Sequence, residues 1–411
     1  MREGKEYILY LFVFINVYKK ALLNLSKPIN KSGFNSGIKM ASQQNLINLL
    51  NLPGTLKKIA EKVFDSEPLT TGDALELYNC SNLAFLGVLA TEVKRKLSGE
   101  YVYFNQNFHL EPTNICVNHC KFCSYRRREG QNGAWECSIE DIIAEVEKYT
   151  TKGATEVHIV GGVHPNRDVN FYVDMLKAIK QAAPKLHIKA FTAVEIDQMC
   201  QMGKTTVEEG LQKLKAAGLE SMPGGGAEIF DETIRAEICP DKTGSTEWLK
   251  IHATAHQMGI PTNATMLYGL LENYEHRVDH LNRLRELQKQ TNGFNAFIPL
   301  KFKRENNAYS HIKESTLTED LKNYAVSRIF LNNIPHLKAY WPMIGKQAAQ
   351  LSLNFGVDDL DGTIDDSTKI YSMAGGEENP SASRAELVKI IKDVILVPVE
   401  RDTLYNILET F

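Results

Sequence analysis

Three cysteines stand close together in the sequence: Cys116, Cys120 and Cys123 are spaced C-x3-C-x2-C within eight residues. Thiolates at this spacing can wrap one iron–sulfur cluster from a single loop, and a [4Fe-4S] cluster takes four outer ligands. Three cysteines leave one iron without a protein ligand, and an open metal position is typical of catalytic sites. The spacing therefore predicts a [4Fe-4S] cluster whose fourth ligand is a small molecule.

Two other metal sites fit the same cysteines. A structural zinc would take His119 or a distant cysteine as its fourth ligand, although the sequence lacks the second cysteine pair that is usual in such sites. A closed electron-transfer cluster would recruit Cys137 across thirteen intervening residues. Cys80, Cys200 and Cys239 stand alone, and we expect them, like Cys137, to be buried small residues rather than ligands.

The composition excludes several classes of protein. The 411 residues carry 47 Lys and Arg against 50 Asp and Glu, a net charge of -3, and 43% are hydrophobic. Near-neutral charge argues against a dedicated nucleic-acid-binding protein, and this hydrophobic content argues against disorder. Seven cysteines, three of them clustered, suit a reducing compartment better than a disulfide scaffold. We therefore expect a folded cytoplasmic protein without a nucleic-acid partner.

An apolar stretch at residues 7–18 is too short to span a bilayer, which takes about 20 residues, so we predict no membrane span. A helical pattern begins soon after Met40. We interpret residues 1–39 as a disordered tail, or as a misread extension upstream of the true start codon, so that Met1 and Met40 are both candidate starts. A peripheral anchor and a secretion signal are the alternatives for this segment.

The cysteine loop must be positioned by a larger α/β fold. Residues 40–104 have the pattern of two or three helices in an N-terminal layer. From 105 to 340, short apolar runs alternate with amphipathic helices, which is typical of repeated βα units. We predict a TIM-like (β/α) barrel, which need not be complete, with a doubly wound sheet as the alternative. Residues 341–411 form a C-terminal extension without an assigned role.

The expected elements follow in a regular order. A capping box at Ser138 and Asp141 begins one helix, which Gly153 ends. Further helices are expected at 170–183, 204–217, 246–258, 274–290 and 318–333. Strands are expected at 108–113, 157–160, 186–193, 219–222, 262–268, 294–300 and 337–341.

The cysteine motif, with Phe122 before its last cysteine, resembles the radical S-adenosylmethionine (SAM) superfamily. The resemblance implies that the amino and carboxylate groups of SAM chelate the open iron, and that an electron from the cluster cleaves SAM to methionine and a 5′-deoxyadenosyl radical. It also implies that Gly161 and Gly162 let the main chain approach the ammonium group of SAM. Val163 stands where the superfamily usually has an acid. Glu195, after the third strand, is expected to hydrogen-bond the ribose of SAM or a substrate group.

The chain is similar to the aminofutalosine synthase family of menaquinone biosynthesis in the segments 220–230, 235–242, 261–269, 297–300 and 339–341. This resemblance covers roughly residues 45–370. It implies that the radical adds to the enolpyruvyl double bond of 3-[(1-carboxyvinyl)oxy]benzoate. Aryl migration and loss of one carboxyl group as bicarbonate then give 6-amino-6-deoxyfutalosine, with SAM consumed as a substrate. Cyclic dehypoxanthine futalosine synthase and the deazaflavin-type cofactor synthases are the alternatives, and a non-catalytic zinc-stabilised barrel is the alternative from another class.

A second glycine run is expected to face the substrate. Gly224, Gly225 and Gly226 follow a strand, and a main chain without side chains can approach a flat or anionic group there. Glu228 and Arg235 follow on the same loop and helix, and Arg235 is a candidate partner for a substrate carboxylate.

Three arginines at residues 126–128 adjoin the cysteine loop. They are expected to attract substrate carboxylates or a low-potential acidic electron donor such as flavodoxin. A simple solvated loop is the alternative interpretation.

Overall fold

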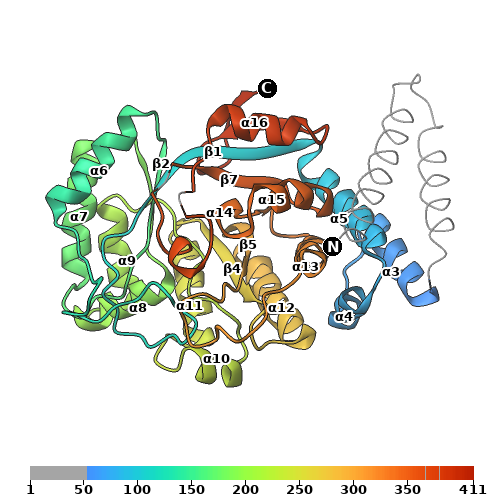
Figure 1. The fold of residues 1–411 in the computed structure, drawn as a ribbon, viewed down its shortest axis with the longest axis horizontal. Coiled ribbons are helices and arrows are strands. Elements are labelled where there is room, and N and C mark those ends of the chain that lie inside the picture. The colour runs from blue at the N-terminus through green and yellow to red at the C-terminus, as the bar shows by residue number, and fades with distance from the viewer. Residues whose placement is uncertain (1–52, 366, 379) are drawn as a thin grey trace.

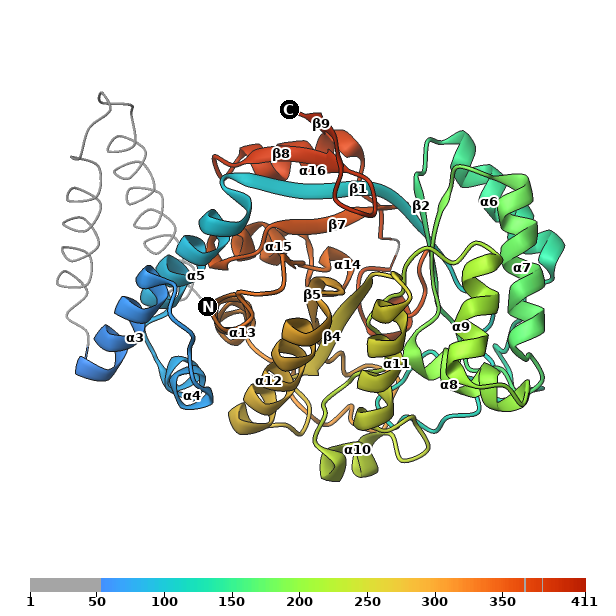
Figure 2. The same ribbon diagram turned by 180° about the vertical axis from the view of Figure 1, so that it is seen from behind.

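The computed structural model describes residues 53–365, 367–378 and 380–411, so the apolar stretch at 7–18 and the expected tail at 1–39 lie outside the described residues. Three helices come first along the described chain: α3 (Gly54–Asp65), α4 (Thr71–Asn79) and α5 (Leu83–Ser98). They lie together at one side of the molecule (Figures 1 and 2), which confirms the predicted helical layer. Within the described part of the chain, no helix combines the length and apolarity that a bilayer crossing requires.

The strands form two sheets around a common interior. In the first, β1 (Tyr101–Leu110) pairs in parallel with β2 (Glu156–Ile159), which pairs with β3 (His187–Ala190). The second consists of β4 (Thr262–Tyr268), β5 (Phe294–Lys301) and β6 (His336–Leu337), all parallel. Isolated bridges connect the sheets at Lys189–Ser221, Met222–Thr262 and Lys338–Asp359. The result is a TIM-like barrel in which isolated bridges, rather than continuous strand pairing, join the two sheets. The sequence predicts such a barrel, which need not be complete.

Helices cover the outside of the strands (Figures 1 and 2). They are α6 (Ile139–Thr151), α7 (Val169–Ala182), α8 (Ala193–Met202), α9 (Val207–Ala216), α10 (Glu232–Ile238), α11 (Ser245–Gln257), α12 (Tyr274–Thr291) and α13 (Leu317–Phe330). Ser138 and Asp141 make the expected capping box at the start of α6. The helical patterns in the sequence therefore mark the crossover helices, because each buries one apolar face against the strands.

Residues beyond 341 complete the sheet. β7 (Asp359–Ile364) and β8 (Val397–Arg401) both pair in parallel with β1, and β9 (Ile407–Thr410) lies antiparallel to β8. The short helices α14 (Trp341–Ile344) and α15 (Lys346–Ser352) lie between β6 and β7, and α16 (Arg384–Lys392) lies between β7 and β8. The unassigned C-terminal segment thus supplies neighbours to the first barrel strand.

Several elements differ from expectation. β1 begins at Tyr101, seven residues before the expected strand at 108. The expected strand at 219–222 makes isolated bridges only, and Trp341 begins a helix instead of ending a strand. Helix α8 was not predicted, because it is short and directly follows the end of an expected strand.

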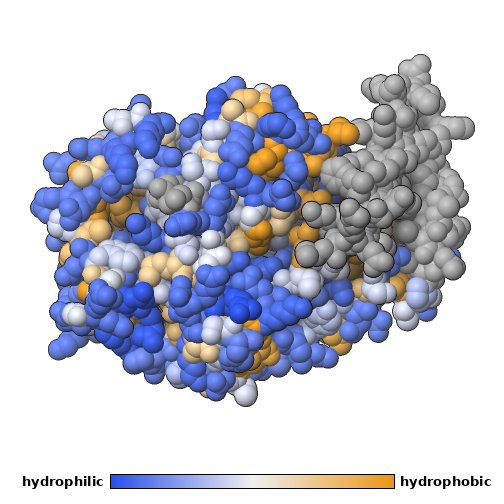
Figure 3. All heavy atoms as spheres, viewed as in Figure 1, coloured by the Kyte–Doolittle hydropathy of each residue, from blue (hydrophilic) through white to orange (hydrophobic). Residues whose placement is uncertain are grey.

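The core is continuous from the N-terminal helices through the barrel to α16. Trp248, Trp341 and Tyr324 are among its largest fully buried side chains. Hydrophilic residues cover most of the face seen in Figure 3, and apolar ones appear there in small groups. The interior of the barrel differs from the core because it contains charged side chains, which surround the site described next.

Candidate active site

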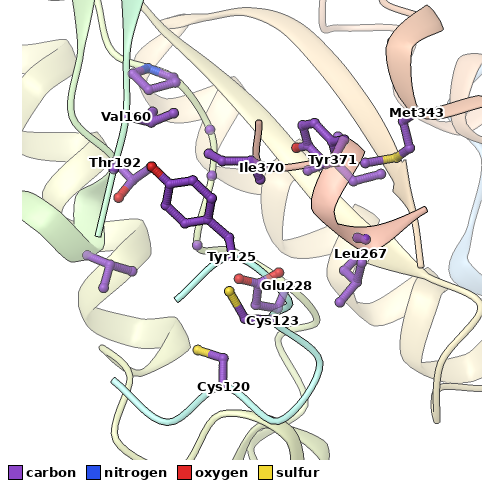
Figure 4. A pocket seen from close by; sticks show the side chains of 18 of the residues that line it. Cys120, Cys123, Tyr125, Val160, Thr192, Glu228, Leu267, Met343, Ile370 and Tyr371 are labelled. Carbon is purple, nitrogen blue, oxygen red and sulfur yellow. The ribbon is translucent and has the colours of Figure 1, made fainter. Parts of the chain in front are cut away.

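A cavity of about 280 Å³ opens at the end of the barrel where the cysteine loop lies. Its wall is built by the cysteine loop, the turn after β2, the loop after residue 222 and the ends of β4 and β5. The C-terminal segment closes one side with Ile370 and Tyr371, and Figure 4 shows these side chains across the cavity from Tyr125. Segments far apart in the sequence therefore meet at one chamber.

All three cysteines of the motif line this cavity. Cys120 is buried, Cys116 and Cys123 are half-buried, and all are free thiols. Figure 4 shows the sulfurs of Cys120 and Cys123 on the same side of the loop. The loop is held from within: the Arg128 guanidinium donates to the main-chain oxygens of Cys116 at 2.7 Å and Val117 at 2.8 Å.

The thiols need a metal to become ligands. Burial raises the pKa of Cys120 to about 12 and also raises the pKa of Cys123, so both thiols stay protonated at neutral pH until a metal binds them. In the described residues, no three His, Cys, Asp or Glu side chains converge on a single ion. Each cysteine of a cluster binds a different iron, so cluster ligands need not converge. The donor set fits a cluster with three protein ligands.

The two residues proposed as other fourth ligands lie elsewhere. His119 is exposed, and its Nδ1 lies 2.8 Å from the Asp241 carboxylate. Cys137 is half-buried, with its sulfur 4.0 Å from the main-chain oxygen of Glu111. Neither belongs to the wall of the cavity.

Gly161 and Gly162 also line the cavity, and their lack of side chains lets the main chain pack closely at this turn. A Cβ on Gly161 would lie 2.9 Å from the Thr113 oxygen, and one on Gly162 would lie 2.3 Å from the Ile115 oxygen. The Gly162 N–H donates to Thr113 at 2.7 Å. The turn after β2 therefore packs directly on the main chain that leads into the cysteine loop, and glycine is required for this contact.

Glu195 lies in the first turn of α8, not at the end of a strand. It forms a capping box with Thr192, and its other carboxylate oxygen accepts from the Gly161 N–H at 3.0 Å. Burial raises the pKa of Glu195 to about 7 despite these hydrogen bonds. The carboxylate lines the cavity beside the glycine turn, where the sequence places a cofactor ligand.

The second glycine run, Gly224 to Gly226, also lines the cavity. A Cβ on Gly224 would lie 2.6 Å from the Asn263 oxygen, and Gly226 has φ +84°. The Trp248 indole donates to the Gly225 oxygen at 3.1 Å. These contacts fix a bare main-chain wall at the cavity, and its role as a substrate platform stays a prediction.

Glu228 and Lys242 form a buried ion pair in the cavity wall. Burial lowers the pKa of Lys242, but the Glu228 carboxylate beside it outweighs burial and holds that pKa well above its usual value. The Lys242 amine also lies 5.7 Å from the centre of the Phe122 ring, which lines the cavity too. Lys242 was not among the predicted site residues, although it stands within the family segment 235–242.

The prediction that Arg235 binds a substrate carboxylate does not agree with its placement. The side chain is 2% exposed and is not part of the cavity wall. Its guanidinium donates to the main-chain oxygens of Ala227, Ile229 and Thr243. Arg235 therefore supports the loop that carries the glycine platform, and it has no face left for a ligand.

A polar floor at the barrel interior was missed by the sequence reading. His109 and His158 are register partners on β1 and β2, their rings lie 4.5 Å apart, and Nε2 of each has no hydrogen-bond partner among the described residues. Burial lowers the pKa of His109 to about 4 and that of His158 well below its usual value, so both are neutral. The sequence carried one signal for this floor: His109 and His158 are polar residues within segments that form buried strands.

Lysines complete this floor. Lys189 donates to both oxygens of Glu156 at 2.9 Å, and Lys338 pairs with Asp361. Tyr340 lines the cavity beside them. The floor thus has balanced charge and several unused hydrogen-bonding groups, as a site for a polar ligand requires.

Family comparisons agree with this arrangement. Residues 110–284 match the model of the Radical SAM superfamily, and residues 291–411 match the CofH/MqnC C-terminal region. An aminodeoxyfutalosine synthase of Thermus thermophilus is 43% identical, over 85% of this chain and 94% of that protein. Its namesake in Streptomyces coelicolor is 40% identical, over 87% and 95%.

Relatives with other names are also similar. A 5-amino-6-(D-ribitylamino)uracil–L-tyrosine 4-hydroxyphenyl transferase of Methanothermobacter thermautotrophicus is 36% identical, over 88% of this chain and 100% of that protein. Among solved structures, the hydrogenase maturase HydG of Carboxydothermus hydrogenoformans has a TM-score of 0.67 at 17% identity, over 91% of this chain and 87% of that chain. Methylornithine synthase has a TM-score of 0.65 at 17% identity, over 82% and 95%. These two structures share the fold.

Proposed function

The chain belongs to the radical SAM superfamily, and we propose that it is an aminodeoxyfutalosine synthase. The proposed reaction joins the 5′-deoxyadenosyl group of SAM to 3-[(1-carboxyvinyl)oxy]benzoate. With water it yields 6-amino-6-deoxyfutalosine, methionine and bicarbonate. Enzymes of this superfamily use a [4Fe-4S] cluster and SAM, and this enzyme takes both.

The single observation that carries the proposal is the shared chamber. The three cysteines, both glycine walls and the C-terminal segment at 370–374 line one cavity, so two substrates can meet inside it. A protein with only an electron-transfer or structural metal has no use for such a space beside its cysteines. The 43% identity to an aminodeoxyfutalosine synthase then favours one pair of substrates.

The roles of the side chains follow from their places. Cys116, Cys120 and Cys123 would hold the cluster, which supplies the electron that cleaves SAM. The Gly161 turn and Glu195 form the wall next to them and would orient SAM. Tyr371 and its neighbours would exclude water from the chamber, which protects a reactive carbon radical from side reactions.

The second substrate would occupy the remaining space. Gly224, Gly225 and Gly226 offer a flat main-chain wall for its aromatic ring. The Glu228–Lys242 pair fixes the edge of this wall. His109 and His158 offer neutral nitrogens at the floor for its polar groups.

One experiment separates this function from its rivals. The protein is reconstituted anaerobically with iron and sulfide, reduced with dithionite, and given SAM with 3-[(1-carboxyvinyl)oxy]benzoate. Mass spectrometry should detect 6-amino-6-deoxyfutalosine in step with methionine. Free 5′-deoxyadenosine without the adduct would instead indicate a hydrogen-abstracting relative such as cyclic dehypoxanthine futalosine synthase, which is 34% identical in Streptomyces coelicolor.

The 4-hydroxyphenyl transferase activity is the other candidate, because relatives with that name reach 40% identity. Incubation with 5-amino-6-(D-ribitylamino)uracil and L-tyrosine tests it directly. We further infer that the enzyme works in the cytoplasm, where thiols stay reduced. A low-potential donor such as flavodoxin would deliver the electron there.

A further inference from the structure

Six lysine and arginine side chains line the cavity, and five of them are held by carboxylates of the protein. The pairs are Lys189–Glu156, Lys242–Glu228, Lys301–Asp320, Lys303–Glu314 and Lys338–Asp361. The sixth is Arg126. Its Nε is buried without a hydrogen-bond partner, and its guanidinium makes no ion pair with any residue that the structure describes.

The acidic residues of the cavity wall already have other partners and do not neutralise Arg126. Glu228 and Asp361 are already paired with lysines. Glu195 accepts hydrogen bonds from Thr192 and from the Gly161 N–H. Arg126 therefore faces the cavity as a half-buried charge that no carboxylate of the cavity wall neutralises, and its buried Nε has no hydrogen-bond partner among the described residues.

The main chain around Arg126 is fixed, so the side chain is presented to the cavity and does not belong to a loose loop. The neighbouring Arg127 donates from Nη1 to the main-chain oxygens of Ser124 and Arg126, both at 2.9 Å. The Arg127 N–H donates to Asn114 at 2.8 Å. Arg127 and Arg128 thus serve the loop itself, and of the three arginines at 126–128 only the first lines the cavity.

We propose that Arg126 binds a carboxylate of the acceptor substrate and so positions it against SAM. A guanidinium presents parallel N–H groups that match a carboxylate in a bidentate pair. The identity of the acceptor rests on the proposed function, in which 3-[(1-carboxyvinyl)oxy]benzoate carries two carboxylates. SAM carries a carboxylate too, so the test must separate the two ligands.

The test measures binding without turnover. Wild type, Arg126→Gln, Arg126→Lys and the control Arg304→Gln, whose arginine is exposed and outside the cavity wall, are reconstituted anaerobically and left unreduced. Equilibrium dialysis gives the Kd of each ligand, and iron content with the thermal midpoint confirms that each variant is folded and loaded. We expect Arg126→Gln to weaken the acceptor about 10- to 100-fold, the range for a charged hydrogen-bonded pair. Arg126→Lys should lose less affinity for the acceptor. The Kd of SAM should stay within about twofold of the wild-type value in all variants.

Two outcomes would overturn the inference. One is an unchanged acceptor Kd in Arg126→Gln, and the other is a loss confined to SAM, which would assign Arg126 to the cofactor. Failure of the proposed function has a different signature, because wild type itself would not bind the enolpyruvyl benzoate. In that case the same dialysis is repeated with L-tyrosine, a carboxylate substrate in the name of several relatives. A tenfold weaker binding of L-tyrosine to Arg126→Gln than to wild type supports the role of Arg126. Equal binding to both proteins, or no binding to wild type, overturns it.

Discussion

The main-chain N–H of Gly161 donates a hydrogen bond to the Glu195 carboxylate, 3.0 Å away. This contact joins the turn after β2 to the first turn of α8, across the wall of the cavity. One side chain thus caps a helix and fixes the turn beside the cysteine loop. Its buried carboxylate also titrates near neutral pH, since burial raises its pKa to about 7.

Glu195→Gln should flatten the pH dependence of stability. The folded-state pKa of about 7 lies above the usual 4.5, so the contribution of Glu195 is full below pH 4.5 and is lost as pH rises through 7. Between pH 5 and 8 the thermal midpoint of wild type should therefore fall further than that of the variant. At pH 5 the variant should be less stable by about 1 kcal/mol, because the amide cannot accept every hydrogen bond of the cap.

The matched control for this experiment is Glu209→Gln in α9. Glu209 makes the same capping box with Thr206, but it is exposed and hydrogen bonds from Thr206 lower its pKa. The contribution of Glu209 is complete above pH 4.5 and is lost only as pH falls below that value, so Glu209→Gln should leave the wild-type slope between pH 5 and 8 unchanged. Equal profiles for Glu195→Gln and wild type would refute the buried titration.

Serine at Cys116, Cys120 or Cys123 should remove most of the iron and the brown colour after anaerobic reconstitution. Serine is a poor ligand for these irons, and each cysteine supplies one of three protein ligands. Cys137→Ser is the control and should keep the iron of wild type, because Cys137 lies outside the cavity wall. Iron and sulfide assays with the absorption spectrum check both results. Loss of iron in Cys137→Ser would show a closed cluster with four cysteines.

Gly162→Ala should disturb the cysteine loop. The new Cβ would lie 2.3 Å from the Ile115 main-chain oxygen, so the two segments must separate. We expect a loss of stability of about 1–3 kcal/mol and lower iron content at the same reconstitution ratio. Gly54→Ala is the control, because a Cβ there meets nothing within 4 Å. Unchanged iron content in Gly162→Ala would show that the loop does not depend on this contact.

Lys242→Met should destabilise the protein by about 3–5 kcal/mol, because it leaves the buried Glu228 charge without its partner. The double variant Glu228→Gln with Lys242→Met should recover part of this loss, since no lone charge remains. Thermal or denaturant unfolding of the four members of the cycle measures the coupling. Additive losses would mean that the pair does not interact in the folded protein.

Local patterns in the sequence were sufficient for most crossover helices. Ser138 and Asp141 mark the start of α6 because a capping box is a local device. Cys116, Cys120 and Cys123 could be assigned to one site for the same reason, since their spacing alone brings three thiols together. The alternation of strands and helices was likewise enough for the barrel.

Long-range pairings were not predictable in this way. β7 (Asp359–Ile364) contains acids that are unusual in a buried strand, and they are tolerated because Asp359 pairs with Arg401 and Asp361 with Lys338. No local pattern signals such partners. Arg235 was misassigned for a related reason: its hydrogen bonds go to main-chain oxygens, which a sequence does not display.

The pairing of β1 with β7 and β8 has a consequence for biosynthesis. Strand β1, the first of the barrel, pairs with β7 (residues 359–364) and β8 (residues 397–401). A growing chain that has not yet reached these residues therefore leaves an edge of β1 unpaired. Ile370 and Tyr371 arrive equally late. A nascent chain therefore cannot close this side of the cavity until residues 359–371 have been made.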